Sequence, residues 1–479
     1  MLFNSYVFML AFLPLTLLCY FLLGRLPEKI QLNKVFLVLA SFLFYGYNNP
    51  SYVPIIAGSI LINYALSQLM LTQQKKALRL PLMLLGLFLN LGVLFYFKYH
   101  DFFFENLNGA FGLHLTLNHL ALPLGISFFT FQQLSYVIDS YKRTVPRYNI
   151  LDYSLFVTFF PQLIAGPIVL HSEIVPQFMD PAKRRFQWGN FSRGLYAFAL
   201  GMAKKVLLAD VFGIAVNYAF ANIPSLNSTN ALIGVVGYIF QMYFDFSGYG
   251  DMAVGLGRML GFEFMRNFNY PYISRSITEF WRRWHISLSS WLRDYLYISL
   301  GGNRKGRVRT YINLLLTMLL GGLWHGAAIR FVLWGALHGV ALALHKMWLA
   351  LVPGAKISGA QMHPLSRIAG IFLTFNLVCF GWLMFRAESM QCVELMLHQI
   401  FTNFNPAVIP QALAGYAGVF ALIGTGYLLH MLPGRVDQMA RSVVMRSPLV
   451  VQVLMAAVLI WCVMQIKSSD IQPFIYFQF

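Results

Sequence analysis

The stretch that decides the fold reads Trp281-Arg-Arg-Trp-His-Ile-Ser-Leu-Ser-Ser-Trp-Leu-Arg-Asp-Tyr295. Wound as a helix at about 100° per residue, it has aromatic, leucine and histidine side chains on one face and mainly arginines on the other. The first face comprises Trp281, Trp284, His285, Leu288, Leu292 and Tyr295, and the second comprises Arg282, Arg283, Ser290 and Arg293. Such a helix is typical of a segment that lies at a membrane surface or lines a cavity floor, and it does not span the bilayer.

A second motif, Gly321-Gly-Leu-Trp-His-Gly326, lies where two hydrophobic segments meet. A helix that starts at Tyr311 reaches His325 after roughly 15 residues, or ~22 Å, of a hydrocarbon core about 30 Å thick. An ionisable side chain at that depth is expensive to hold and usually has a function. The next predicted helix, from Ile329 to Trp348, places a polar seam beside His325, which favours a wet cavity over lipid exposure. The seam comprises Arg330, Trp334, His338 and His345.

The composition predicts a polytopic membrane protein, because 58% of the 479 residues are hydrophobic and only 11% are charged. Hydropathy predicts an all-α chain with about ten or eleven spans of ~20 residues each, plus re-entrant and interfacial helices. We expect a single membrane-embedded domain over residues 1–479, with its motifs densest at about 241–346. The first apolar run lacks the basic start and cleavage site of a secretory signal and is expected to remain as a span.

Several predicted segments have distinctive features. Between Leu151 and Phe178 the prolines and glycines predict a re-entrant or interfacial element. Further spans are predicted at 368–385, 415–432 and 449–466. The four cysteines, which share no metal or disulfide spacing and most of which lie in apolar runs, are interpreted as packing residues. They are Cys19, Cys379, Cys392 and Cys462.

The formal net charge of +18 comes from short basic clusters between apolar runs, which is the pattern of cytoplasmic loops and argues against nucleic-acid binding. The positive-inside rule therefore predicts an extracytoplasmic N-terminus. The clusters used for this orientation are Arg25, Lys29 and Lys34; Lys75, Lys76 and Arg79; and Lys142, Arg143 and Arg147.

Asp245 and Asp251 fall within a predicted span and therefore need partners. Arg258 or Arg266 is expected to serve, and a buried ion pair that holds helices in register is preferred to a proton relay. The chain has no Walker loop, zinc-ligand spacing or Gly-x-Ser-x-Gly elbow, so ATPases, metalloenzymes and serine hydrolases lack their required parts and no metal is expected.

The residues alone leave alternatives open for each motif. His325 is either a structural histidine between helices or a general base toward a hydroxyl group. His285 is either packed among tryptophans or a second active-site group, and the nearby arginines pair with lipid phosphates or with the phosphates of a donor. For the whole chain, the intramembrane charges and interrupted helices also suit a transporter or flippase for an acyl or polysaccharide precursor, although no inverted repeat is visible. A structural scaffold is a third class.

Several long motifs, in order, resemble the membrane-bound O-acyltransferase family. They are Gln241 through Tyr243-Phe-Asp-Phe-Ser-Gly-Tyr, Asn267-Phe-Asn-Tyr-Pro-Tyr-Ile, Ser276-Ile-Thr-Glu-Phe-Trp-Arg-Arg-Trp-His-Ile-Ser-Leu-Ser and Leu319-Leu-Gly-Gly-Leu-Trp-His-Gly-Ala. Within the family, the sequence is most similar to the branch of alginate O-acetyltransferase membrane subunits and teichoic acid D-alanyl transfer proteins. The resemblance implies helices around a central tunnel that crosses the bilayer, with His325 matching the family's invariant histidine and His285 that of the preceding Trp-His motif.

The resemblance further implies an acyl donor on the cytoplasmic side, acetyl-CoA in the alginate-type branch, and no bound cofactor. The acyl group would pass to a separate SGNH-type acetyltransferase protein outside the cytoplasm or to the polysaccharide itself, in the bacterial inner membrane among lipids. We therefore predict an O-acetyltransferase of an exported or cell-surface polysaccharide, with His325 as general base and His285 as a group that orients the donor. The expected substrate or donor contacts are Trp281, Arg282, Trp284, Trp324, Arg330 and His338.

Overall fold

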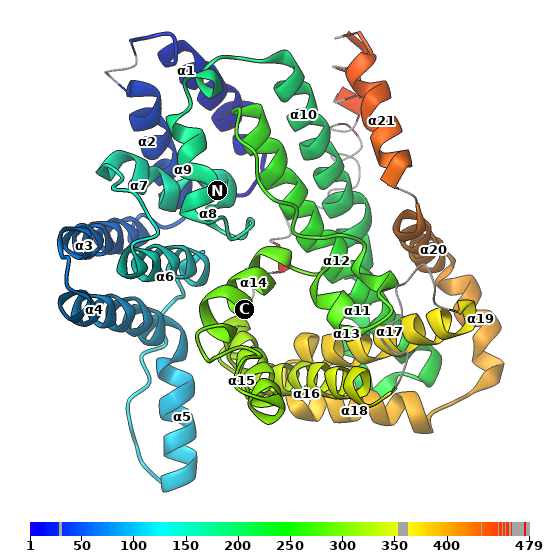
Figure 1. Ribbon diagram of the computed structural model, residues 1–479. Helices are drawn as coiled ribbons and strands as arrows, with labels where there is room; N and C mark the ends of the chain where they lie inside the picture. Colours follow the sequence, from blue (N-terminus) through cyan, green and yellow to red (C-terminus); the bar gives the residue numbers. More distant parts are fainter. Residues whose placement is uncertain are drawn as a thin grey trace. The chain divides into compact units, whose positions relative to one another are not determined.

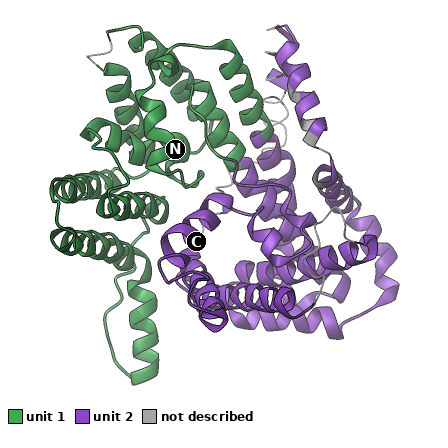
Figure 2. Ribbon diagram, viewed as in Figure 1, with its two compact units in different colours: residues 1–200, 249–265 green, residues 201–248, 266–479 purple. Residues whose placement is uncertain are grey.

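The computed structural model describes residues 1–27, 31–352, 363–432, 434–448, 450–452, 454–455, 457–458, 461 and 474–475. Every regular element in these ranges is a helix, so the predicted all-α class is confirmed (Figure 1). The chain divides into two compact units, one of residues 1–200 and 249–265 and the other of residues 201–248 and 266–479 (Figure 2). The predicted single domain stays a prediction, and each unit is described by itself.

The first unit is built from helices of very different length. Its elements are η1 (Phe8–Phe12), α1 (Leu13–Leu23), α2 (Leu32–Gly46), α3 (Tyr52–Thr72), α4 (Lys76–Leu94), η3 (Phe95–Tyr99), α5 (His100–Phe111), α6 (Ile126–Lys142), α7 (Ile150–Thr158), α8 (Phe160–Leu163), α9 (His171–Met179), η4 (Pro181–Arg184), most of α10 (Trp188–Ala203) and the last third of α12 (Ser228–Met259). Helices α7, α8 and α9 confirm that residues 151–178 do not form one straight span.

Buried amides join three helices of this unit. Helix α6 packs against α3 and α4, as Figure 1 shows. Asn90 donates from Nδ2 to Asn63 Oδ1 at 2.6 Å, and Asn63 donates to Gln133 Oε1 at 3.1 Å. Gly86 of α4 permits the close approach, since a Cβ there would lie 2.9 Å from Val137 Cγ1. Interhelical hydrogen bonds and small residues are the usual means of helix association in lipid, where apolar surface gives little driving force.

The second unit holds the motifs singled out in the sequence. Its elements are η5 (Lys204–Ala209), α11 (Asp210–Ala221), η6 (Ile223–Ser225), the first two thirds of α12 (Ser228–Met259), η7 (Pro271–Ile273), α13 (Ile277–Trp281), α14 (Ile286–Trp291), η8 (Leu292–Tyr297), α15 (Arg307–His325), α16 (Ile329–Leu351), α17 (Pro364–Arg386), α18 (Met390–Thr402), η9 (Pro406–Val408), α19 (Ile409–Gly415), α20 (Ala417–Met431) and α21 (Gly434–Arg446).

Helices α15 and α16 pack against each other extensively. Two glycines are required where the backbones meet. A Cβ on Gly322 would lie 2.2 Å from the carbonyl oxygen of Phe331, and a Cβ on Gly335 would lie 2.3 Å from that of Met318. Neither position has room for a side chain, so these glycines fix the separation of the two helices that bear the histidine motif and the polar seam.

Five helices in the described part of the chain are long and apolar enough to cross a membrane. They are Tyr52–Thr72, Lys76–Phe111, Ser228–Met259, Ile329–Leu351 and Pro364–Arg386. The pair Pro406–Gly415 and Ala417–Leu429, bent by 79°, makes a sixth if it is one span. Shorter apolar helices cover Phe8–Leu23 and Leu32–Gly46. The predicted span at 449–466 and the predicted packing role of Cys462 fall wholly or partly outside the described residues.

A buried ion cluster lies in the second unit. Lys205 Nζ is 2.6 Å from Asp245 Oδ1 and 2.8 Å from Asp210 Oδ1. The expectation that Arg258 or Arg266 would pair with Asp245 is therefore wrong. The expectation that Asp245 belongs to a buried ion pair is confirmed. The second carboxylate oxygen of Asp245 accepts a 2.8 Å hydrogen bond from the backbone N–H of Ile475, and the ring of Phe474 lies 4.8 Å from Lys205 Nζ.

Candidate active site

The tryptophan-rich stretch is not the single helix that its period predicts. Helix α13 ends at Trp281, and α14 begins at Ile286. Between them His285 has φ 43° and ψ 56°, in the left-handed region that costs a non-glycine residue free energy. The predicted division of the faces is nevertheless correct for burial. Trp281, Trp284, His285, Leu288, Leu292 and Tyr295 are buried, whereas Arg282 and Arg293 are exposed.

His285 is fully buried among aromatic rings. Its ring centroid lies 4.8 Å from that of Phe246 and 6.2 Å from that of Trp324. The residue lies between α13 and α14, outside the candidate spans. Burial lowers the pKa of His285 to about 3, so its imidazole is neutral near pH 7.

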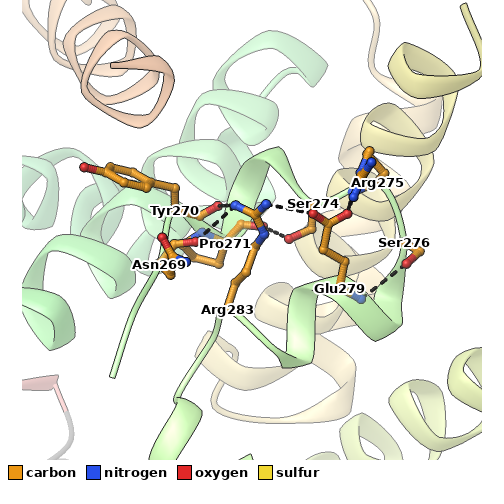
Figure 3. A network of polar contacts seen from close by, with 8 residues as sticks. All are labelled: Asn269, Tyr270, Pro271, Ser274, Arg275, Ser276, Glu279 and Arg283. Atoms are coloured by element: carbon orange, nitrogen blue, oxygen red, sulfur yellow. Dashed lines mark hydrogen bonds and ion pairs between the residues drawn. The ribbon is translucent and has the colours of Figure 1, made fainter. Parts of the chain in front are cut away.

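A carboxylate between two arginines organises the turn before His285 (Figure 3). Glu279 Oε2 is 2.7 Å from Arg275 Nε, and Glu279 Oε1 is 2.7 Å from Arg283 Nη2. Burial raises the pKa of the Glu279 carboxyl, but hydrogen bonds from Arg275 and the charges of both arginines outweigh it and leave this pKa below its ordinary value. Arg283 is thus paired with a protein carboxylate, as is Arg293 with Asp294 at 2.7 Å, and the pairing of either arginine with a phosphate stays a prediction.

His325 is the last residue of α15 and is 5% exposed. Its ring centroid lies 5.0 Å from that of Trp334 and 5.2 Å from that of Phe385. The glycine that follows it is sterically required, because a Cβ on Gly326 would lie 2.1 Å from the Phe331 ring. The His-Gly pair therefore ends the helix while the Phe331 ring packs against the bare backbone.

Trp324 and Trp334 connect the histidines of the unit. The Trp324 ring contacts both His285, at 6.2 Å between centroids, and His325, at 5.1 Å. The Trp334 ring contacts His325 and, at 4.5 Å, His338. The three imidazoles and their intervening indoles thus form one aromatic cluster contributed by α15, α16 and the turn before α14.

Two nitrogens of this cluster and one of a neighbouring indole have no hydrogen-bond partner within the described ranges. They are Trp281 Nε1, Trp334 Nε1 and His338 Nδ1. Trp281 packs against His338 with ring centroids 5.3 Å apart. Buried polar groups normally have a partner, so these nitrogens could donate to, or accept from, a bound substrate.

The structure assembles most of the predicted site residues. Trp281, Trp284, Trp324 and His338 are buried in one unit with both histidines, and Trp284 packs on Trp382 with centroids 4.8 Å apart. Arg330 lies at the edge, where Nη1 donates to the carbonyl oxygen of Phe385 at 3.4 Å and the guanidinium covers the Phe331 ring at 4.6 Å. Arg282 is exposed, and no contact places it in the aromatic cluster.

Three aromatic residues around the histidines escaped the sequence analysis: Phe246 of α12, and Trp382 and Phe385 of α17. Phe246 lies in the motif Tyr243-Phe-Asp-Phe-Ser-Gly-Tyr but was given no role at the site, whereas Trp382 and Phe385 lie in an apolar run where aromatic residues are abundant, so nothing local marked these two. The motif around Asn267 could have been recognised as part of the site, because it places a polar residue between a long span and the tryptophan-rich stretch.

Comparison with known proteins decides the family. The sequence model of the membrane-bound O-acyltransferase family matches residues 42–385. The chain belongs to this family. That range includes both histidine motifs and the aromatic cluster, and the acyltransferase is therefore an enzyme of the membrane, as its apolar helices also indicate.

Three relatives show how far the similarity extends. The acyltransferase is 43% identical to the probable alginate O-acetylase AlgI of Pseudomonas aeruginosa over 84% of this chain and 75% of the relative. It is 40% identical to the peptidoglycan O-acetyltransferase of Helicobacter pylori over 82% of this chain and 78% of the relative. It is 39% identical to the probable alginate O-acetylase AlgI of Pseudomonas putida over the full length of both chains.

The geometry suits proton transfer during acyl transfer. A neutral imidazole can accept a proton from a hydroxyl group, and aromatic walls exclude the water that would hydrolyse an activated acyl group. Among the described residues, no group of three histidine, cysteine or acidic side chains could hold a metal ion.

Proposed function

We propose that the protein moves acetyl groups from acetyl-CoA on the cytoplasmic side of the bacterial inner membrane to hydroxyl groups of an exported or cell-surface polysaccharide. Family membership supports the acyl transfer, and the names of the alginate and peptidoglycan relatives support acetyl as the group and a polysaccharide as the acceptor. The basic clusters between apolar segments support an extracytoplasmic N-terminus.

The observation that carries the proposal is the pair of buried histidines joined through Trp324. Two ionisable rings held in an apolar cluster have a high desolvation cost, which function can explain. We assign His325 as the general base, because α15 ends at this residue and holds its buried imidazole against the indoles of Trp324 and Trp334. We assign to His285 the role of orienting the donor thioester, since a neutral imidazole ring can hold the acyl group by a hydrogen bond.

In the proposed reaction His325 accepts the proton of the acceptor hydroxyl group while the oxygen of that group bonds to the acyl carbon. The carbon–sulfur bond then breaks, and the thiolate leaves with the proton returned by the imidazolium. Trp281, Trp284, Trp324, Arg330 and His338 would contact donor or acceptor, and the unpaired nitrogens of Trp281 and His338 support such a role. Arg282 is proposed only for the phosphates of the donor, since its side chain is exposed.

The acceptor is proposed to be either the polysaccharide or a separate SGNH-type acetyltransferase that forwards the acetyl group. Both present a hydroxyl group, so the role of His325 is the same. Acetylation that requires a second purified protein would support the two-protein route.

The test is the O-acetyl content of the cell-surface polysaccharide in cells whose only copy carries His325→Ala. We expect at least a 10²-fold loss, in the range typical of a missing general base. His398→Ala is the matched control, because His398 is exposed on α18 and its ring hydrogen-bonds with Thr402, one turn further along the same helix. It should leave acetylation unchanged, and both variants should be present in the membrane at the wild-type level.

Purified protein separates the enzyme from a transporter. We expect wild-type protein in detergent to cleave the thioester of labelled acetyl-CoA when acceptor is present, and the His325→Ala protein not to do so. Normal acetylation in cells with the His325→Ala protein, or substrate counterflow without thioester cleavage, would contradict the proposal.

A further inference from the structure

The backbone at His285 is held in an unfavourable conformation. Its φ of 43° and ψ of 56° cost a residue with a Cβ on the order of 1 kcal/mol. Such a conformation persists only where the surrounding contacts determine it. The period of the flanking residues favours a continuous helix through this point, so long-range contacts must break it.

Asn267 supplies these contacts on the C-terminal side of His285. Its carbonyl oxygen accepts from the N–H of Ile286 at 2.9 Å. Its side-chain Oδ1 accepts from the N–H of Ser287 at 3.0 Å and from the Ser287 hydroxyl at 2.8 Å. The first N–H groups of a helix have no partner within it, so one buried asparagine caps α14 from a distant part of the sequence.

A second set of bonds fixes the N-terminal side. The N–H of Asn269 donates to the carbonyl oxygen of Arg283 at 2.9 Å. The Arg283 guanidinium donates to the carbonyl oxygens of Asn269, at 3.3 Å, and Tyr270, at 3.5 Å, as Figure 3 shows. Glu279 holds that guanidinium through its 2.7 Å ion pair.

Both sides of His285 are therefore tied to residues 267–270. In a continuous helix, the carbonyl oxygen of Arg283 and the N–H of Ile286 would each bond within the helix. Here both groups bond to residues 267–270 instead, so the helix is interrupted at Trp284 and His285, which lie between them. Since the imidazole is fully buried beside Phe246 and Trp324, any change of its backbone moves the ring within a packed cluster.

We propose that Asn267 and Glu279 are positioning residues that break the helix at His285 and aim its imidazole at the reacting thioester. The inference rests on the proposed role of His285. Asn267 is assigned the larger effect, because its Oδ1 caps α14 directly, whereas Glu279 acts through Arg283.

The test compares the steady-state kinetics of purified variants. Asn267→Ala removes Oδ1 and should lower kcat about 10²-fold, the effect expected of a displacement near 1 Å, with KM changed less than about threefold. Asn267→Asp keeps an acceptor at the same place and should restore kcat to within about tenfold. Glu279→Gln should lower kcat about tenfold. Asn403→Ala is the control, because the Asn403 side chain also makes a hydrogen bond to the backbone of this unit, donating to the carbonyl oxygen of Leu226, without contact to His285.

A double variant distinguishes positioning from general stability. If Asn267 acts through His285, Asn267→Ala should lower the residual turnover of the His285→Ala protein by less than about twofold. The same 10²-fold loss in both backgrounds would overturn the inference, as would full activity of Asn267→Ala when His285→Ala is inactive. Full activity of His285→Ala would overturn the inference and the proposed role of His285 together.

Discussion

The ion cluster of Lys205, Asp245 and Asp210 gives a prediction in which two substitutions are less harmful than one. Lys205 and Asp245 each have side chains no more than 3% exposed, whereas the Asp210 side chain is 24% exposed. Removing one partner of a buried pair costs about 3–5 kcal/mol, because the remaining charge stays buried without compensation. Lys205→Met leaves the Asp245 carboxylate without its ammonium partner and with the hydrogen bond from the N–H of Ile475, so we expect the full loss.

Asp245→Asn should cost less. Lys205 keeps Asp210 at 2.8 Å, and the amide oxygen of the new side chain can still accept from the ammonium group. We expect about 1–3 kcal/mol, the cost of a weakened buried hydrogen bond to a charge. The double variant Lys205→Met and Asp245→Asn leaves only the partly exposed Asp210 without its ammonium partner, so it should be more stable than Lys205→Met alone by about 2 kcal/mol.

The assay is thermal unfolding of the purified variants in one detergent, followed by the fraction that remains monodisperse after heating. Lys204→Met is the matched control, since Lys204 is half-buried and its ammonium lies 5.9 Å from the Tyr243 ring, a contact worth about 1 kcal/mol or less. The reasoning is refuted if Lys205→Met unfolds at the wild-type temperature, or if the double variant is less stable than Lys205→Met.

Two more predictions concern the histidine motifs. Gly322→Ala should cost about 1–3 kcal/mol and reduce acetyl transfer, because the new Cβ would meet the carbonyl oxygen of Phe331 at 2.2 Å. Gly92→Ala, where nothing lies within 4 Å, should be neutral or slightly stabilising in the same melting assay. For His285, the folded pKa of about 3 lies below the ordinary 6.5, so the unfolded chain binds the extra proton between these values. Stability should therefore fall as the pH drops below about 6.5, by up to about 1.4 kcal/mol per pH unit, and His285→Gln should reduce this slope in pH-dependent melting; an unchanged slope would contradict it.

The sequence predicted the helical class and the region of the site because those depend on local composition. The apolar runs fixed the long helices, and the seam of Arg330, Trp334 and His338 follows from the helical period alone. The burial of His325 at the end of α15 follows from the position of the Gly-Leu-Trp-His-Gly motif at the end of an apolar run. Periodicity also assigned Trp281, Trp284 and His285 correctly to the buried side.

Two features escaped prediction because contacts distant in the sequence decide them. The break at His285 depends on hydrogen bonds to Asn267, and a helical period contains no information about such partners. The partner of Asp245 was sought among arginines nearby in sequence, whereas Lys205 is 40 residues away, in η5. In both cases the local pattern was compatible with more than one structure, and tertiary packing selected between them.

The contact of Ile475 with Asp245 has a practical consequence for studies of the protein. Phe474 and Ile475 are 1% and 6% exposed, so both residues are buried. A reporter or affinity tag fused directly after Ile475 would compete with a hydrogen bond to a buried carboxylate, and low yield of such a fusion would say little about the native chain. The exposed loop at residues 112–116 is a better place for an epitope, since every residue there faces outward.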